Sequence, residues 1–169
     1  WRTYTQDLSN PLIPPKSDGQ IVVSSVNIEE NGQRQPVNYV LPPGISRMFD
    51  SSQPQLLQQN EQALSMKITD LSPADARAVY KSTAYDLRRY KRLQMFAHAE
   101  APIDESKTLS NGDFSVFIRL GSDYKNNYYE YEVPLDLTPH STILYNTNNS
   151  ADQEKVWPLN NTLNFKLET

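Results

Sequence analysis

The sequence predicts a mainly β protein, an antiparallel two-sheet sandwich of jelly-roll, galactose-binding-like type with one short helix. The best evidence is the stretch from Asn111 to Leu135, where two alternating segments flank a Gly-Ser-Asp turn and form a predicted hairpin. A two-residue period places the apolar side chains of each segment on one face, which we expect to be core, Tyr129 and Tyr131 included. These side chains are Phe114, Val116, Ile118 and Leu120 in the first segment and Tyr129, Tyr131, Val133 and Leu135 in the second.

Further short apolar or β-branched runs, separated by turn residues, raise the predicted strand count to between seven and nine. The first two runs, residues 21–28 and 37–41, suit a hairpin across Glu29 to Gly32. The one convincing helix start is Ser72-Pro73-Ala74-Asp75, so a helix is predicted over residues 73–80. The remaining predicted strands are residues 63–69, 92–99, 142–145, 156–157 and 163–167.

Length and composition suit one domain of 169 residues and 19.4 kDa. Residues 1–20, with three prolines and little periodicity, are predicted to be an extended arm, and residues 21–169 a single sandwich domain. The net charge of −4 and the lack of an isolated basic run predict no nucleic-acid binding. No run approaches the roughly 18 apolar residues of a membrane helix, so we expect a soluble domain, and its Trp1 start suggests a piece of a longer protein.

Reactive residue types are scarce, and we expect no catalytic residues and no cofactor. The chain has two histidines, five glycines and no cysteine, which argues against thiol catalysis, a zinc cluster and a glycine-rich phosphate loop. His98 lies within an apolar segment, so a structural, hydrogen-bonded role is favoured over catalysis. His140 is expected to be solvated.

Carboxylate side chains suggest two alternative kinds of site, a catalytic pair and a calcium site. Glu130 and Glu132 share a strand face with Tyr128, which favours a solvated sheet face, but a hydrolase that pairs one of them with Asp123 is the alternative. A structural calcium ion is a second possibility, although no calcium-loop spacing is present. Its candidate ligands are Asp104, Glu105, Asn111, Asp113 and Asp123.

Tyrosine is clustered between residues 124 and 131. If Tyr129 and Tyr131 are core, the free residues of this segment are the candidates for contact with a protein partner or a glycan. These candidates are Tyr124, Asn126, Asn127 and Tyr128. The one basic cluster, Arg88 to Arg92 beside Asp86, is interpreted as a solvated or locally paired face.

Several long motifs resemble the SprA (Sov) family of outer-membrane proteins, which serve gliding motility and the type 9 secretion system of Bacteroidetes. The resemblance extends from about residue 37 to the Val-Trp-Pro segment that starts at Val156. The motifs are VNYVLPPGISR from Val37, QQNEQALSM from Gln58, YDLRRYKRLQMFAHAE from Tyr85 and FIRLGSDYKNNYYEYEVPL from Phe117.

The resemblance implies a non-catalytic soluble domain of the secretion translocon SprA, whose parent protein is embedded in the outer membrane of a Gram-negative bacterium. The domain would scaffold the pore or contact other translocon subunits or secreted cargo, on the extracellular side in preference to the periplasmic side. A carbohydrate-binding jelly-roll module of a cell-surface protein is the alternative.

Overall fold

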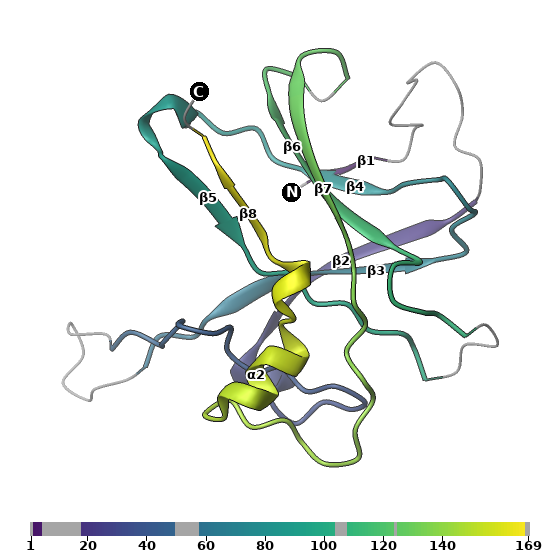
Figure 1. Ribbon diagram of the computed structural model, residues 1–169, viewed down its shortest axis with the longest axis vertical. Helices are drawn as coiled ribbons and strands as arrows, with labels where there is room; N and C mark the ends of the chain where they lie inside the picture. Colours follow the sequence, from purple (N-terminus) through teal and green to yellow (C-terminus); the bar gives the residue numbers. More distant parts are fainter. Residues whose placement is uncertain (1, 5–17, 50–57, 104–107, 124, 168–169) are drawn as a thin grey trace.

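The computed structural model describes residues 2–4, 18–49, 58–103, 108–123 and 125–167. Within these residues the eight strands pair as four antiparallel two-stranded ribbons, β1–β4, β2–β3, β5–β8 and β6–β7 (Figure 1). The strands are β1 (Arg2–Tyr4), β2 (Gln20–Asn27), β3 (Gln62–Thr69), β4 (Ala78–Tyr80), β5 (Arg92–Met95), β6 (Ser115–Gly121), β7 (Tyr128–Pro134) and β8 (Leu163–Lys166). The helices are α1 (Ile28–Asn31) and α2 (Ser150–Val156), with single 3₁₀ turns η1 (Leu87–Arg89) and η2 (Leu159–Asn161).

The predicted mainly β, antiparallel class is confirmed, whereas the jelly-roll sandwich is not. A sandwich needs strands with neighbours on both sides, but each described strand has one hydrogen-bonded partner. The strands predicted at residues 37–41 and 142–145, which would have widened the sheets, are irregular. The chain therefore builds ribbons where the sequence predicts two sheets.

The β6–β7 hairpin is predicted correctly. Its register pairs Val116 with Val133, Ile118 with Tyr131 and Leu120 with Tyr129, so the predicted apolar positions do share a face. Strict alternation on both sides of a short turn fixes this register, because a slip by one residue would move every apolar side chain to the other face.

The strands predicted at residues 21–28 and 63–69 are also confirmed, as β2 and β3. The prediction that residues 37–41 form the hairpin partner of β2 is wrong. The Asn27 side chain accepts a hydrogen bond from the Glu30 N–H at 2.9 Å and begins α1, which directs the chain away from β2. Pro36 and Pro42, which flank the 37–41 segment, have no N–H to donate to a strand partner. Instead, β2 pairs with β3 over eight residues.

The helix predicted at residues 73–80 is wrong. Ala74 has a φ of 61°, which interrupts a helix at its second residue. The Asp75 carboxylate lies 3.0 Å from the Arg77 guanidinium, and both side chains are almost fully buried. Residues 78–80 then form β4, which pairs with β1 at the start of the predicted arm; residues 5–17 of that arm lie outside the described residues.

Towards the C-terminus the predictions are mixed. The strand predicted at 163–167 is confirmed as β8. The strand predicted at 92–99 is shorter in the structure, where it is β5 and pairs with β8. The strand at 156–157 is wrong, because Val156 ends α2. The Asn149 side chain caps this helix by accepting from the N–H groups of Ala151 and Asp152.

The buried core lies where α2 meets the irregular 37–41 segment. It consists of Val37, Tyr39, Val40, Tyr145, Val156 and Trp157. Side chains, in place of a neighbouring strand, bond the backbone groups of Tyr145 and the Val40 carbonyl. The Asn38 amide donates to the Tyr145 carbonyl at 2.9 Å and accepts from the Tyr145 N–H at 2.8 Å, and the Trp157 indole N–H donates to the Val40 carbonyl at 3.0 Å.

Much apolar surface remains outside this core. Within the described residues, seven hydrophobic residues are buried, whereas 16 large hydrophobic residues are exposed. An isolated two-stranded ribbon is only marginally stable, because little apolar surface is buried in it. The exposed apolar side chains of these ribbons are surface that a partner can cover.

We predict that Asn38→Ala lowers the free energy of unfolding by about 3 kcal/mol, because it leaves both backbone groups of buried Tyr145 without partners. The shift in the urea unfolding midpoint measures this. The control is Asn148→Ala at an exposed position, which should change stability by less than about 0.5 kcal/mol. Equal midpoints for the two variants would contradict the role assigned to Asn38.

Candidate functional site

The β6–β7 turn carries the site residues predicted from sequence. Asp123 organises this turn: its Oδ1 accepts from the N–H groups of Lys125 and Asn126 at 2.8 and 2.7 Å, and its Oδ2 accepts from the Asn127 side-chain amide at 2.7 Å. These hydrogen bonds lower the pKa of Asp123 to about 2. Asn126 and Asn127 are exposed, and Tyr124 lies outside the described residues.

Tyr128, the fourth predicted contact residue, is half-buried. The Arg119 guanidinium lies 4.2 Å from the centre of the Tyr128 ring and 5.4 Å from that of Phe117. The Arg119 Nε also donates to the Glu130 carboxylate at 2.5 Å. The arginine therefore covers the Tyr128 ring and ties the two strands together across this face.

The opposite face of the hairpin corrects the prediction that Tyr129 and Tyr131 are core. Tyr129 is 85% exposed and Tyr131 38% exposed. The Tyr131 ring packs against Phe165 of β8, with the ring centres 4.8 Å apart. Alternation places both tyrosines on the apolar face correctly, but no second layer covers that face. Tyr129 and Tyr131, together with Phe165, are termed the hairpin aromatic strip below.

The carboxylates of this hairpin serve its own structure. Glu130 and Glu132 are exposed, as the solvated-face interpretation predicts, and each bonds across the ribbon, to Arg119 and Ser115 respectively. Asp123 accepts its hydrogen bonds from the backbone and side chain of its own turn, and these bonds account for its lowered pKa. The geometry therefore gives the hydrolase alternative no support.

The described members of the calcium set proposed from sequence do not converge. Asp113 precedes β6 and Asp123 follows it, so the seven-residue strand separates them by about 20 Å. The Asn111 side chain accepts from the Leu137 N–H, and that of Asp113 from the Ser110 N–H. Asp104 and Glu105 lie outside the described residues. Within the part of the chain that is described, no group of three or more metal-ligating side chains occurs.

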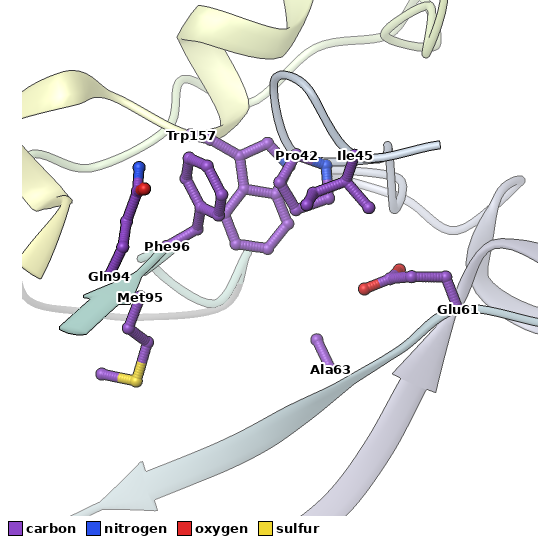
Figure 2. A pocket seen from close by; sticks show the side chains of 8 residues that line it. All are labelled: Pro42, Ile45, Glu61, Ala63, Gln94, Met95, Phe96 and Trp157. Carbon is purple, nitrogen blue, oxygen red and sulfur yellow. The ribbon is translucent and has the colours of Figure 1, made fainter. Parts of the chain in front are cut away.

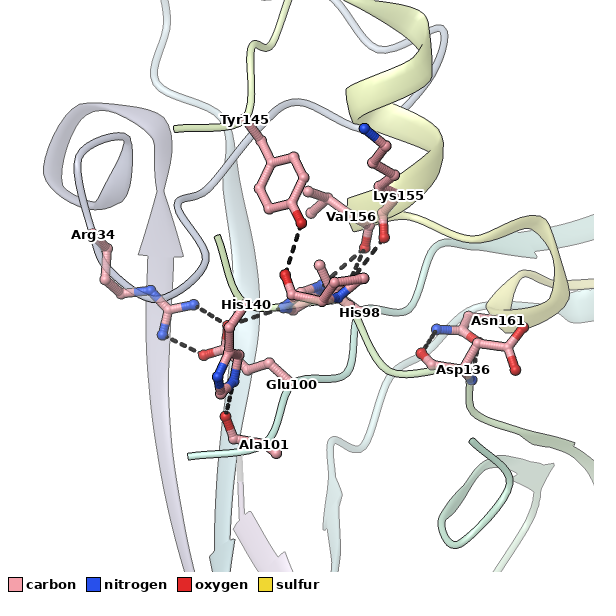
Figure 3. A network of polar contacts seen from close by, with 12 residues as sticks. Arg34, His98, Glu100, Ala101, Asp136, His140, Tyr145, Lys155, Val156 and Asn161 are labelled. Carbon is pink, nitrogen blue, oxygen red and sulfur yellow. Dashed lines mark hydrogen bonds and ion pairs between the residues drawn. The ribbon is translucent and has the colours of Figure 1, made fainter. Parts of the chain in front are cut away.

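A polar network links the segments that surround the core (Figure 3). The His98 Nδ1–H donates to the Val156 carbonyl at 2.8 Å, and its Nε2 lies 3.3 Å from the Glu100 carboxylate. The Arg34 guanidinium makes a bidentate contact with Glu100 at 2.6 and 2.8 Å. His98 is hydrogen-bonded, as the sequence predicts. Exposed His140 bonds the Ala101 carbonyl at 2.7 Å.

Sequence reasoning missed an open hollow beside the core, between the start of β3 and the end of β5 (Figure 2). Its volume is about 350 Å³. Glu61 and Trp157 both line it, and the Tyr39 hydroxyl donates to the Glu61 carboxylate. Burial and this hydrogen bond raise the pKa of Tyr39 well above its usual value of 10. The residues that line the hollow are scattered between positions 42 and 157, which explains why no local motif indicates it.

These features define a β-rich protein with a small core and an aromatic surface, in which the described hairpin carboxylates bond within the hairpin itself. The chain matches the SprA_N family model, described as motility related/secretion protein, over residues 1–169. The chain belongs to this family, and the resemblance stated from sequence is confirmed. Among curated proteins no match was found. The family associates the chain with the cell envelope, and none of the described helices has the length and apolarity to cross a membrane.

The polar network predicts an acid-sensitive contribution to stability. Burial opposes ionisation of Glu100, but the hydrogen bonds from His98 and Arg34 outweigh it and lower the pKa of Glu100 below its usual 4.5. A lowered folded-state pKa contributes stability that is full above about pH 4.5 and is lost as the pH falls through the folded value.

We therefore expect the stability advantage of the native chain over Glu100→Gln to shrink between about pH 5.5 and pH 3. Urea unfolding across this range, with exposed Glu154→Gln as the control for removal of one carboxylate, measures the difference. An advantage that is independent of pH would exclude ionised Glu100 as its source.

Proposed function

We propose that this chain is a non-catalytic domain of an outer-membrane translocon of the type 9 secretion system, and that its β6–β7 hairpin contacts other translocon subunits or secreted cargo. The observation that supports this proposal most directly is the exposed hairpin aromatic strip. Tyrosines are favourable contact residues, because each ring buries a large apolar area while its hydroxyl stays hydrogen-bonded. Family membership supports the link to secretion and motility.

The backbone of the hairpin supports the same proposal. In the described residues β6 pairs with β7 alone, so each of these seven-residue strands has one edge without a strand partner. Such an edge binds extended segments by strand addition, with the backbone supplying affinity and the side chains specificity. Tyr129 and Tyr131 of the strip belong to the same ribbon as these edges, so one partner can engage both.

The carbohydrate-binding alternative receives less support from the site. It predicts exposed, coplanar aromatic rings on one sheet face or at loop tips around Tyr124 to Tyr129. In the described part of this segment Arg119 covers the Tyr128 ring and Asp123 engages the Asn127 amide. Tyr129 and Tyr131 lie on the other face of the hairpin. This arrangement favours a protein contact. In the proposal the domain lies on the extracellular side of the outer membrane, needs no cofactor and acts by scaffolding or partner contact.

We predict that Tyr129→Asp in the full-length protein lowers secretion at least several-fold, because a charged residue replaces an aromatic anchor of the type worth roughly 2 kcal/mol or more. Secreted cargo in the culture medium is the measured quantity. Tyr85→Asp is the matched control, because Tyr85 is also a highly exposed tyrosine, 71% exposed, but lies outside the hairpin.

Both variants should accumulate at the level of the native protein, since neither changes a buried residue. Normal secretion with Tyr129→Asp, or an equal defect in both variants, would contradict a specific contact by the hairpin.

A further inference from the structure

The open hollow beside Trp157 combines apolar walls with a carboxylate (Figure 2). Apart from the Glu61 carboxylate and the Gln94 amide, its lining side chains are apolar or aromatic. These are Pro42, Ile45, Ala63, Met95, Phe96 and Trp157. The site thus suits a guest with an apolar stem and one polar end.

The charge of Glu61 has no cationic partner among the described residues. Its side chain extends from the start of β3 towards the Trp157 ring (Figure 2), and the hydrogen bond that it accepts comes from the neutral Tyr39 hydroxyl. Arg47 donates to the Gln59 carbonyl at 2.9 Å, close in sequence to Glu61, but the carboxylate that it pairs with is that of Glu29, at 2.5 Å. An ionised carboxylate accepts about four hydrogen bonds, so Glu61 retains capacity for a charged donor.

The aromatic wall is held rigidly in place. The Trp157 indole N–H is bonded to the Val40 carbonyl, and the rings of Tyr39 and Phe96 meet Trp157 edge-on, with centres 6.0 and 6.4 Å away. Lysine and arginine bury their methylene stems against such surfaces, and aromatic rings attract the cationic end. A fixed aromatic wall beside a carboxylate is therefore complementary to a basic side chain.

We propose that this hollow receives a lysine or arginine side chain from an extended segment of a partner protein, with the cation on Glu61 and the stem against Trp157 and Phe96. The proposal rests on the proposed function and deepens it by naming the chemistry of the partner. β3 and β5, which border the hollow, each pair on one side alone within the described residues, so an extended backbone finds a free edge beside it. The net charge of −4 favours approach of a basic segment.

Two blocked peptides, Thr-Val-Thr-Lys-Thr-Val-Thr and the same sequence with norleucine in place of lysine, test the proposal. Calorimetry gives their affinities, and the NMR signal of the Trp157 indole N–H locates the binding. We expect the lysine peptide to bind the native chain about tenfold more tightly, as befits one partly buried charge-assisted contact. Blocked lysine alone should bind more weakly than the peptide, because it offers no backbone to the strand edges.

Glu61→Gln should abolish the preference for lysine, while its amide oxygen still accepts from the Tyr39 hydroxyl and preserves the core. The control Glu154→Gln removes an exposed carboxylate on α2 and should leave the preference unchanged.

Equal binding of the two peptides by the native chain, a preference that survives Glu61→Gln, or absence of binding at millimolar peptide would overturn the proposal. Blocked lysine that binds as tightly as the peptide would overturn the extended segment as occupant. These results would leave the comparison of Tyr129→Asp with Tyr85→Asp unaffected, so failure here is distinguishable from failure of the hairpin contact.

Discussion

The fold depends on the reciprocal hydrogen bonds between the Asn38 side chain and the backbone of Tyr145. Irregular backbone is expensive to bury, because every N–H and C=O needs a partner. Here an amide side chain takes the place of a neighbouring strand, and the Trp157 indole does the same for the Val40 carbonyl. These contacts join residues more than 100 positions apart, so α2 and the 37–41 segment form one core from which the ribbons extend.

A core of this kind leaves the ribbons dependent on other contacts. In a sandwich the apolar face of each sheet is covered by the other sheet, but the β6–β7 ribbon has Phe165 of β8 against Tyr131 and leaves Tyr129 in solvent. The same organisation creates the hollow, since β3 and β5 approach Trp157 without pairing with each other. The hairpin aromatic strip and the hollow therefore have one physical origin, which is a set of strands whose sheets are incomplete in the described chain.

The sequence predicted those parts of the fold that local patterns determine. Alternation around a short turn placed Tyr129 and Tyr131 on the correct face of β7, but it carries no information about what covers that face, so their burial was wrong. Residues 37–41 are an apolar run that suits a strand, and their irregular backbone depends on the hydrogen bonds between Asn38 and the distant Tyr145. The α2 start at Asn149 is a usable local signal, since Asn-Ser-Ala-Asp is a favourable cap, but the apolar Val156-Trp157 pair suits a strand equally well by pattern. For the hollow, Tyr39, Glu61 and Trp157 come together through the tertiary fold alone.

In the proposed function, partners complete the β6–β7 ribbon in the secretion machinery. Amide hydrogen exchange of residues 115–134, compared between the isolated chain and the assembled full-length protein, tests it most directly. We expect the outward-facing amides of β6 and β7 to exchange rapidly in the isolated chain and to become protected in the assembly, whereas amides of α2 should be protected in both. Equally rapid exchange of the hairpin amides in the two states would contradict the claim.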